Sequence, residues 1–416
     1  MSASPNAMKP GLVVLVLTLL LGIQPVTTDM YLPALPALTQ GFGSSMAQAQ
    51  YTLSALVLAF GASQMVWGPL SDRFGRKPIL LTGALMYVAA SLGGATSNSM
   101  EQLIGWRVLQ GMAMGAAVMC ARAIVRDLYA PAEGARVMSK GLTGLGFIAC
   151  AAAPVGGVLS EWFGWRFTLL ALAVFAGLTL VLVLLRFEET LARRNPEALR
   201  PALMLRNWAT IARHPTFWAW TLLATTSYAG LFSFLAASSF VLTGVLGLSK
   251  TQYGLAMFSI SASYIVGTFI CRRLLRRLGV RRTVGLAAVL TLSGGTLMGL
   301  LPWLGVQSLW GVMLPFYLFM LGHGVHQPCG QSNGVSPFPS AAGAASALAG
   351  FVMMLVAFAF SSWIGLALTE PALGAGTVRP LTDSVWLWSV LIAATAWTLV
   401  QRHGEVPSAP ARVATA

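Results

Sequence analysis

A charged loop between two long uncharged stretches is the feature that most limits how this chain can fold. The loop at residues 68–78 reads Gly-Pro-Leu-Ser-Asp-Arg-Phe-Gly-Arg-Lys-Pro and carries four charged side chains. Residues 51–67 before it and residues 79–100 after it contain none. A short polar loop between long apolar runs is typical of a chain that leaves a bilayer and turns straight back into it. The pattern therefore predicts a membrane-spanning segment on each side of the loop.

The composition extends this prediction to the whole chain. Its 416 residues are 56% hydrophobic and 9% charged, whereas soluble domains contain about 25% charged residues. A spanning helix needs about 20 apolar residues, and segments of this length favour helices over the strands of a β-barrel. We therefore expect an all-α membrane protein with twelve transmembrane helices. Their approximate ranges are residues 12–38, 50–70, 79–98, 102–125, 136–160, 165–187, 217–243, 252–271, 283–302, 308–329, 341–367 and 384–401.

The most polar stretch, residues 186–215, divides the chain near its middle. Residues 73–77, Arg-Phe-Gly-Arg-Lys, also have a degenerate counterpart in residues 277–282, about half a chain later. Two six-helix halves related as parallel repeats are the layout of one large class of transporters. We expect four parts, namely a six-helix half at residues 1–187, a cytoplasmic central loop at 188–215, a second six-helix half at 216–402 and a cytoplasmic tail at 403–416.

The distribution of basic residues predicts the orientation in the membrane. The net charge is +14, and all but four of the 26 lysine and arginine residues lie in the termini, or in or next to the loops that follow even-numbered helices. Such loops are cytoplasmic under the positive-inside rule, so both termini should be cytoplasmic too. Because the charges are spread between apolar segments, they do not indicate a nucleic-acid-binding face. The exceptions are Arg107, Arg166, Lys250 and Arg379.

The remaining composition predicts no cofactor and no metal. The four cysteines lie in or beside apolar segments at unrelated spacings, which favours neither a disulfide framework nor a metal site. The first apolar segment has no small-residue cleavage site after a short apolar core, so we expect a retained helix rather than a signal peptide. No ATP-binding loop is present, and the energy for any transport should come from an ion gradient.

Several motifs together resemble one family. Residues 68–77 resemble the signature loop of the major facilitator superfamily, and residues 29–36, Asp-Met-Tyr-Leu-Pro-Ala-Leu-Pro, resemble its Bcr/CflA drug:proton antiporters. Residues 101–111, 126–129 and 343–350 resemble the same subfamily. The resemblance implies a major facilitator fold in a bacterial cytoplasmic (inner) membrane, no enzymatic activity, and exchange of drugs for protons. Two departures are a helix-5 motif one residue shorter than usual, at residues 153–157, and an uncharged loop near residues 332–340.

Asp29 and Arg107 are the candidates for proton coupling. Asp29 is the only charged residue between Gly11 and Gln50, and a charge at mid-membrane costs roughly 2.5–3.5 kcal/mol. Taking up a proton relieves that cost, so Asp29 could couple proton flux to drug binding. The alternative is a structural carboxylate at the outer water interface. The resemblance implies that Arg107 supports the acid on helix 1; the alternative is a structural arginine bonded to helix carbonyls and to Gln110.

The other candidates concern the substrate and the conformational change. We expect Asp72 to meet the start of helix 11, near Ser340, as part of a latch between the halves, against the alternative of a solvated loop. Tyr31 and the His323–His326 pair, three residues apart on helix 10, could face the substrate, although a polar lining without a proton or ligand role is the preferred interpretation for the histidines. The latch candidates are Gly68, Asp72, Arg73, Gly75, Arg76 and Arg126. The substrate-cavity candidates are Tyr31, Gln110, His323, His326 and Gln327, and the helix-5 candidates for a seal between the halves are Pro154, Gly156 and Gly157.

These observations predict an exporter of small, largely apolar drugs that takes up protons in exchange, acts as a monomer and alternates between two states. A proton-coupled uptake symporter for a nutrient is the first alternative, although the second half offers few of the polar residues that a sugar or amino-acid site would need. A non-transporting membrane sensor is the second alternative, and the absence of a sizeable soluble domain in the sequence argues against it.

Overall fold

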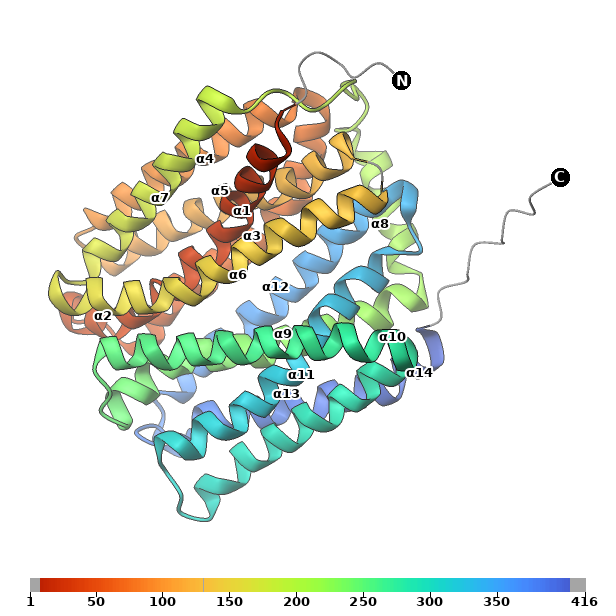
Figure 1. Cartoon of the computed structure of the whole chain (residues 1–416). Helices are drawn as coiled ribbons and strands as arrows, with labels where there is room; N and C mark the ends of the chain where they lie inside the picture. Colours follow the sequence, from red (N-terminus) through yellow and green to blue (C-terminus); the bar gives the residue numbers. More distant parts are fainter. Residues whose placement is uncertain (1–7, 130, 405–416) are drawn as a thin grey trace.

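The computed structural model describes residues 8–129 and 131–404, and in this part of the chain the regular elements are helical (Figure 1). The helices of the first half are α1 (Pro10–Asp29), η1 (Leu32–Ala34), α2 (Leu35–Phe42), α3 (Met46–Phe74), α4 (Arg76–Ala95), α5 (Met100–Leu128), α6 (Pro131–Trp162) and α7 (Trp165–Arg186). The later helices are α8 (Pro201–Ala212), α9 (Pro215–Ser239), η2 (Phe240–Val245), α10 (Lys250–Trp303), α11 (Leu309–Val335), η3 (Pro339–Ala341), α12 (Ala342–Ala367), η4 (Pro371–Leu373), α13 (Arg379–Trp397) and α14 (Leu399–His403).

Eleven helices of the described chain are long and apolar enough to span a membrane, and one of them is long enough for two spans. That helix is α10, whose 54 residues would extend about 80 Å if straight, far beyond a hydrocarbon core of about 30 Å. Gly279 interrupts it with φ +73°, and the chain turns back there (Figure 1). Glycine adopts this left-handed conformation without the steric penalty of a side chain. The prediction of twelve long helices, with a break between residues 271 and 283, is therefore confirmed.

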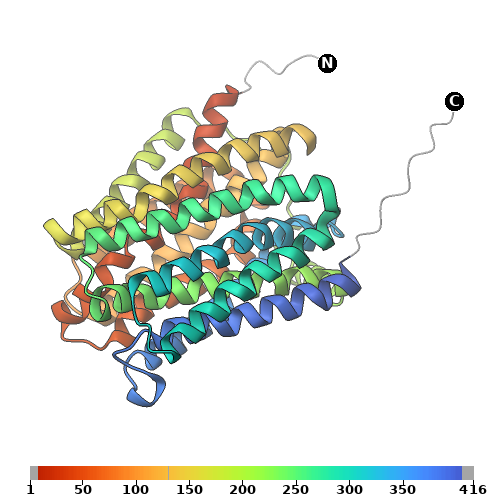
Figure 2. The same cartoon turned by 60° about the horizontal axis from the view of Figure 1, so that its bottom comes forward.

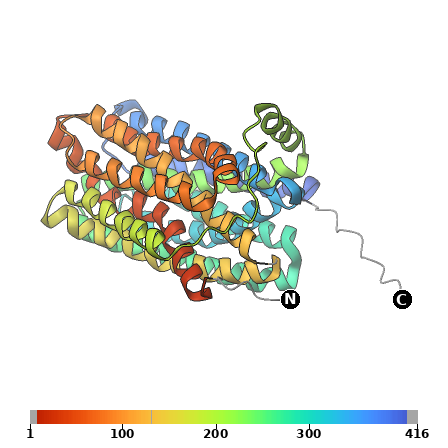
Figure 3. The same ribbon diagram turned by 90° about the horizontal axis from the view of Figure 1, so that it is seen from above.

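The helices before and after α8 form two groups. In the first group α5 packs against α3 and α4, while α1 packs against α6; in the second, α9 packs against α11, α12 and α13. The groups meet along two seams, α3 against α12 and α6 against α10 (Figure 2). The beginning of α1, α8 and α14 lie at one end of the bundle (Figure 3). We call this the basic end, because the charged loop between α3 and α4 lies there as well, and the opposite end the closed end.

The structure corrects two expectations about the helices. The first span is not one uniform helix, because α1 ends at Asp29 and continues through η1 into α2, where Pro33 and Pro36 occupy the early positions of the new helical segments. The expected central loop also contains α8. Ile211 of α8 is buried while Leu205 is 62% exposed, so the segment is an amphipathic helix. The charged residues around it led to the expectation of a loop.

Candidate functional site

A cavity of about 1200 Å³ lies between the two groups of helices. It extends from Asp29 at the end of α1 to Trp208 on α8 at the basic end, so it opens toward the basic end. Its walls are mostly apolar and rich in methionine, with Met65, Met119 and Met354 among the lining residues. Unbranched methionine side chains can adapt to ligands of different shape. The cavity therefore suits a small, largely apolar molecule.

Contacts between the two groups shut the cavity at the closed end. The Ser239 hydroxyl on α9 donates a 2.6 Å hydrogen bond to the carbonyl of Leu32. The Lys250 ammonium at the start of α10 donates to the carbonyl of Ser160 on α6, at 3.0 Å. Along the other seam, Gln50 on α3 donates to the hydroxyl of Ser361 on α12 at 2.7 Å. The described structure is thus a state accessible from the basic end alone.

The glycines of the helix-5 motif let α6 approach its neighbours closely. A Cβ atom on Gly156 would lie 2.1 Å from the carbonyl oxygen of Met30, and one on Gly157 would lie 2.5 Å from that of Lys250. Pro154 lies inside α6 one turn earlier, and its Cα is 2.8 Å from the position of a Cβ on Gly254 of α10. Gly157 thus faces the other group of helices, as expected for a seal, whereas Gly156 packs against its own group.

Asp29 lies at the inner boundary of the cavity, on the last residue of α1. Its side chain is half-buried, and its Oδ1 accepts a 2.8 Å hydrogen bond from the Thr28 hydroxyl. Within the described residues no lysine, arginine or histidine forms an ion pair with it. A carboxylate with apolar surroundings and no cationic partner is stabilised by protonation. This arrangement is suited to uptake and release of one proton.

Arg107 does not contact Asp29. Its side chain is 1% exposed and lies outside the cavity lining, with the guanidinium carbon 4.0 Å from the centre of the Tyr31 ring. The guanidinium donates to the carbonyls of Thr27 and Thr52, both at 3.3 Å, and to Gln110. These contacts match the alternative interpretation, a structural arginine bonded to helix carbonyls and to Gln110. They still bear on the acid, because Thr27 lies two residues before Asp29 and Arg107 holds that turn of α1.

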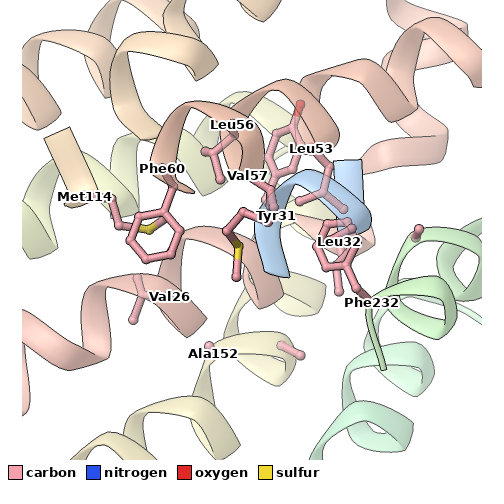
Figure 4. Packing of buried hydrophobic residues seen from close by; sticks show 14 of the residues in the cluster. Val26, Tyr31, Leu32, Leu53, Leu56, Val57, Phe60, Met114, Ala152 and Phe232 are labelled. Atoms are coloured by element: carbon pink, nitrogen blue, oxygen red, sulfur yellow. The ribbon is translucent and has the colours of Figure 1, made fainter. Parts of the chain in front are cut away.

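Only two of the five substrate-cavity candidates, His323 and Gln327, line the cavity. Tyr31 is buried with Leu53 and Val57 of α3 (Figure 4), since a step of two residues from Asp29 turns a side chain to nearly the opposite side of a helix. Gln110 is buried too, and its amide donates to the Ser91 hydroxyl at 2.7 Å. For Tyr31 and Gln110 the expected position was therefore wrong.

The two histidines on α11 do not share a wall of the cavity. His323 lines the cavity, and its Nδ1 lies 2.8 Å from the hydroxyl of the buried Ser227. His326 is fully buried, with its Nε2 3.5 Å from the Thr291 hydroxyl of α10. A step of three residues turns the side chain by about 60° around the helix axis, which is enough to direct His326 into the packing between α11 and α10. The structure thus places His323 in the cavity lining, and the expected position in the lining was wrong for His326.

The charged loop is built around Arg76 and stays within the first group of helices. The Arg76 guanidinium, 2% exposed, is 2.6 Å from the Asp72 carboxylate and 2.8 Å from that of Asp127 at the end of α5. Glu189, beyond α7, accepts the backbone N–H groups of Arg76 and Lys77 at 2.9 and 3.1 Å. These bonds join the loop, α5 and the linker after α7 into one clamp. Asp72 is therefore engaged inside its own half, not across the halves as expected.

The other latch candidates occupy different surroundings. Gly75 takes φ +109°, and Glu189 approaches so closely that a Cβ there would lie 2.4 Å from its carboxylate oxygen. Arg73 is exposed and lies over the Phe74 ring, and Gly68 borders Met119. Arg126 lies beside Gly343 at the start of α12, with its Nη1 3.6 Å from the position of a glycine Cβ. Of the expected latch, only Arg126 is placed near the other half in this state.

The sequence interpretation missed three residues of the site. Asp127 and Glu189 hold Arg76, and Arg122 on α5 donates a 2.6 Å hydrogen bond to the Ser346 hydroxyl on α12. Arg122 could have been found, because it lies four residues before Arg126 and therefore on the same helical face. The role of Glu189 depends on a fold that brings it to a loop more than 100 residues earlier.

Comparison with known proteins agrees with this architecture. The family model described as Major Facilitator Superfamily matches residues 17–361. The chain is 28% identical over 94% of its length to "Multidrug resistance protein D" of Escherichia coli, covering 97% of that protein. It is 27% identical to "Chloramphenicol resistance protein" of Pseudomonas aeruginosa, over 77% of this chain and 75% of that one.

The chain is also similar to a third resistance protein and to a transporter of known structure. The "Bicyclomycin resistance protein homolog" of Haemophilus influenzae is 27% identical, over 82% of this chain and 86% of that one. Among solved structures, a bacterial homologue of the human lysosomal transporter Spinster, inward-facing and occupied, superposes with a TM-score of 0.72 at 16% identity, covering 97% of this chain and 100% of that one. That likeness shows the shared fold. The chain belongs to the Major Facilitator Superfamily, a family of transporters and not of enzymes.

Proposed function

We propose that this protein exports small, largely apolar drugs across a bacterial cytoplasmic membrane and takes up protons in exchange. The relatives named as resistance proteins support the export of drugs. The positive-inside rule supports an orientation with the basic end, and both termini, in the cytoplasm. In that orientation the described state receives drug from the cytoplasm or from the inner leaflet, and the opposite state releases it outside.

The observation that carries the proposal is the isolation of Asp29. The cavity lining in the described chain contains two carboxylates, and the other one, Asp72, is already paired with Arg76 at the basic end. Asp29 instead lies against the closed end with only a threonine hydroxyl as its partner. It is therefore the acid that can change protonation without breaking an ion pair.

Exchange follows if drug and proton compete for this end of the cavity. A drug that reaches Asp29 in the described state stabilises the ionised carboxylate by its charge when it is cationic, or by donating a hydrogen bond to it when it is neutral. After the change to the outward-open state, protonation of Asp29 favours release of the drug. The coupling is reciprocal, because a ligand that weakens proton binding is itself bound less tightly by the protonated protein.

The test is drug-driven proton movement in everted membrane vesicles from an efflux-deficient bacterium that expresses the full chain. The substrates are first identified by testing drugs from several classes for those to which expression of the protein makes the bacterium resistant. In the Asp29→Asn variant we expect normal insertion, no drug-driven proton movement and loss of resistance. Glu101→Gln is the matched control, since Glu101 is an exposed carboxylate outside the cavity lining.

Three outcomes would contradict the proposal. Unchanged proton exchange by Asp29→Asn would remove Asp29 from the coupling mechanism. Accumulation of a solute together with protons would identify an uptake symporter. Absence of any transport by well-folded protein, with every drug in the panel, would favour a sensor.

A further inference from the structure

Two arginines on α5 face the cavity without a carboxylate partner. Arg122 and Arg126 lie four residues apart, so their side chains occupy the same face of the helix one turn apart. Both line the cavity at the basic end, where Arg122 is partly buried and Arg126 is exposed. Within the described residues neither forms an ion pair with an aspartate or glutamate. Two like charges at this spacing repel each other.

The nearest acidic residues are already engaged. Asp72 and Asp127 both bind the Arg76 guanidinium, at 2.6 and 2.8 Å. Glu189 accepts the backbone N–H groups at the start of α4. These bonds leave the positive charge of Arg122 and Arg126 without a partner in the state that opens toward the basic end.

The opposite wall adds further positive potential. It is the start of α12, where Ala342 and Gly343 of the first turn line the cavity together with Ser346, one turn after Ala342, which accepts the 2.6 Å hydrogen bond from Arg122. This 26-residue helix has no acidic residue in its first turn and no side-chain cap on its N-terminal N–H groups. The N-terminus of a helix favours negative charge, and its free N–H groups are hydrogen-bond donors. The arginine pair and the helix end therefore converge on one small volume.

Apolar walls begin directly beside this positive region. One turn or two deeper into the cavity, α5 contributes Val118 and Met119 and α12 contributes Met353 and Met354 to the lining. A bound molecule would meet charge at the basic end and hydrocarbon toward Asp29. That sequence of environments matches a molecule with an acid group at one end and an apolar body at the other.

We propose that Arg122 and Arg126, together with the first turn of α12, form a binding subsite for the carboxylate or sulfonate of an amphipathic organic acid. This inference rests on the proposed function and extends its substrates from cationic and neutral drugs to acidic ones. A guanidinium presents two parallel N–H groups that fit a carboxylate or sulfonate, which a point charge does not match. The apolar body of the ligand lies between α5 and α12.

The experiment compares an acid with its own neutral ester. Naproxen, naproxen methyl ester and acetate are titrated by calorimetry into the purified full-length protein. The unmodified protein should bind naproxen at least about tenfold more tightly than the ester at low salt, the scale of one charge-assisted hydrogen bond. The preference should shrink as salt is added. Acetate, which lacks the apolar body, should bind far more weakly than naproxen.

The variants assign the preference to the two arginines. Arg122→Gln with Arg126→Gln should abolish the preference for the acid while the affinity for the ester changes less than about twofold, so that ester binding shows that the cavity is still folded. Arg276→Gln with Arg277→Gln is the control, since it removes the same charge from exposed positions on α10 outside the cavity. It should keep the preference. Single Arg126→Gln, at an exposed position, supplies a second variant should the double one fail to fold, and it should reduce the preference.

Four results would overturn the subsite. They are equal affinity of the unmodified protein for acid and ester, a preference that survives the double variant or is undiminished in the single variant, loss of the preference in the control, and acetate binding as tight as that of naproxen. None of these results bears on proton exchange. A protein that loses resistance with Asp29→Asn but shows no preference for acids is still an exporter. A protein that prefers acids but moves no drug has the subsite without the proposed function.

Discussion

The carboxylate of Glu161 on α6 accepts a 2.7 Å hydrogen bond from the backbone N–H of Thr251, which joins the two groups of helices at the closed end. Thr251 is in the first turn of α10, so the carboxylate lies at the positive end of that helix. Lys250, one residue earlier, donates to the carbonyl of Ser160 next to Glu161. In both bonds α10 supplies the donor and α6 the acceptor, and together they hold the closed end shut.

Replacing Glu161 should therefore shift the protein toward the state that opens at the other end. Glu161→Ala removes the acceptor at the start of α10, so the described state loses one of the contacts that hold the closed end shut. The opposite state, in which this end is open, loses no such contact. Spin labels placed on α6 and α10 at the closed end report the distance between the two helices. The fraction of molecules with the longer distance should be larger in Glu161→Ala than in the unmodified protein. Glu101→Ala, at an exposed helix start within one group, should leave the distribution unchanged. An identical distribution in both variants would show that Glu161 has no part in closing this end.

Gly157→Ala should have a similar but stronger effect. The new Cβ would lie 2.5 Å from the carbonyl oxygen of Lys250, a contact with backbone that cannot move aside without separating α6 from α10. Overpacking of this kind costs about 1–3 kcal/mol, and the cost is incurred only while the closed end is shut. We expect the outward-open population to rise and drug binding from the basic end to weaken. Gly177→Ala on α7, with open space around it and outside the cavity lining, is the control.

Gly75→Ala should destabilise the whole protein. Its φ of +109° is unfavourable for any residue with a side chain, and the new Cβ would displace the Glu189 carboxylate from the N–H groups of Arg76 and Lys77. A strained backbone position of this kind costs about 1–3 kcal/mol. Thermal unfolding of the purified protein in detergent measures the loss. Gly105→Ala in α5, with no atom nearby, should unfold close to the temperature of the unmodified protein.

Arg107→Lys should reduce drug:proton exchange as well as stability. An ammonium cannot reach the carbonyls of Thr27 and Thr52 together as the guanidinium does, and each lost hydrogen bond in the buried interior costs about 1–3 kcal/mol. The Thr27 turn should then move, and with it Asp29. Transport is normalised to folded protein in the membrane, which separates coupling from yield. Full exchange per folded molecule would mean that Arg107 serves the structure alone.

Much of the fold could be predicted because hydropathy is a local property of the chain. The uncharged runs on either side of residues 68–78 predicted two spans, and the same rule predicted the turn that the structure places at Gly279. The helix α8 was not predicted, because the charged residues that flank it lower the mean hydropathy of so short a segment. The burial of Ile211 depends instead on tertiary packing. The break after Asp29 likewise depends on how η1 fits between α6 and α9.

The candidate site was predictable only in part. Asp29 stood out because it is isolated in an apolar segment, and the structure places it at the cavity. Its expected companion Arg107 is absent from the cavity, because the guanidinium finds carbonyls on α1 and α3 that no spacing along the sequence reveals. The same holds for Asp72, whose charge is engaged by Arg76 in this state and not by the other half.

The sequence by itself determined the membrane class, the number and order of the spans, and the residues whose charge is costly within a bilayer. These properties follow from transfer of local segments from water to hydrocarbon. Tertiary structure alone decided what those charged side chains contact. Glu189 accepts the backbone N–H of Arg76, Arg122 donates to the Ser346 hydroxyl and Glu161 accepts the backbone N–H of Thr251, and each of these bonds joins segments far apart in the chain. It also decided which end of the cavity is open, since that depends on contacts between the two groups of helices and not on the composition of either.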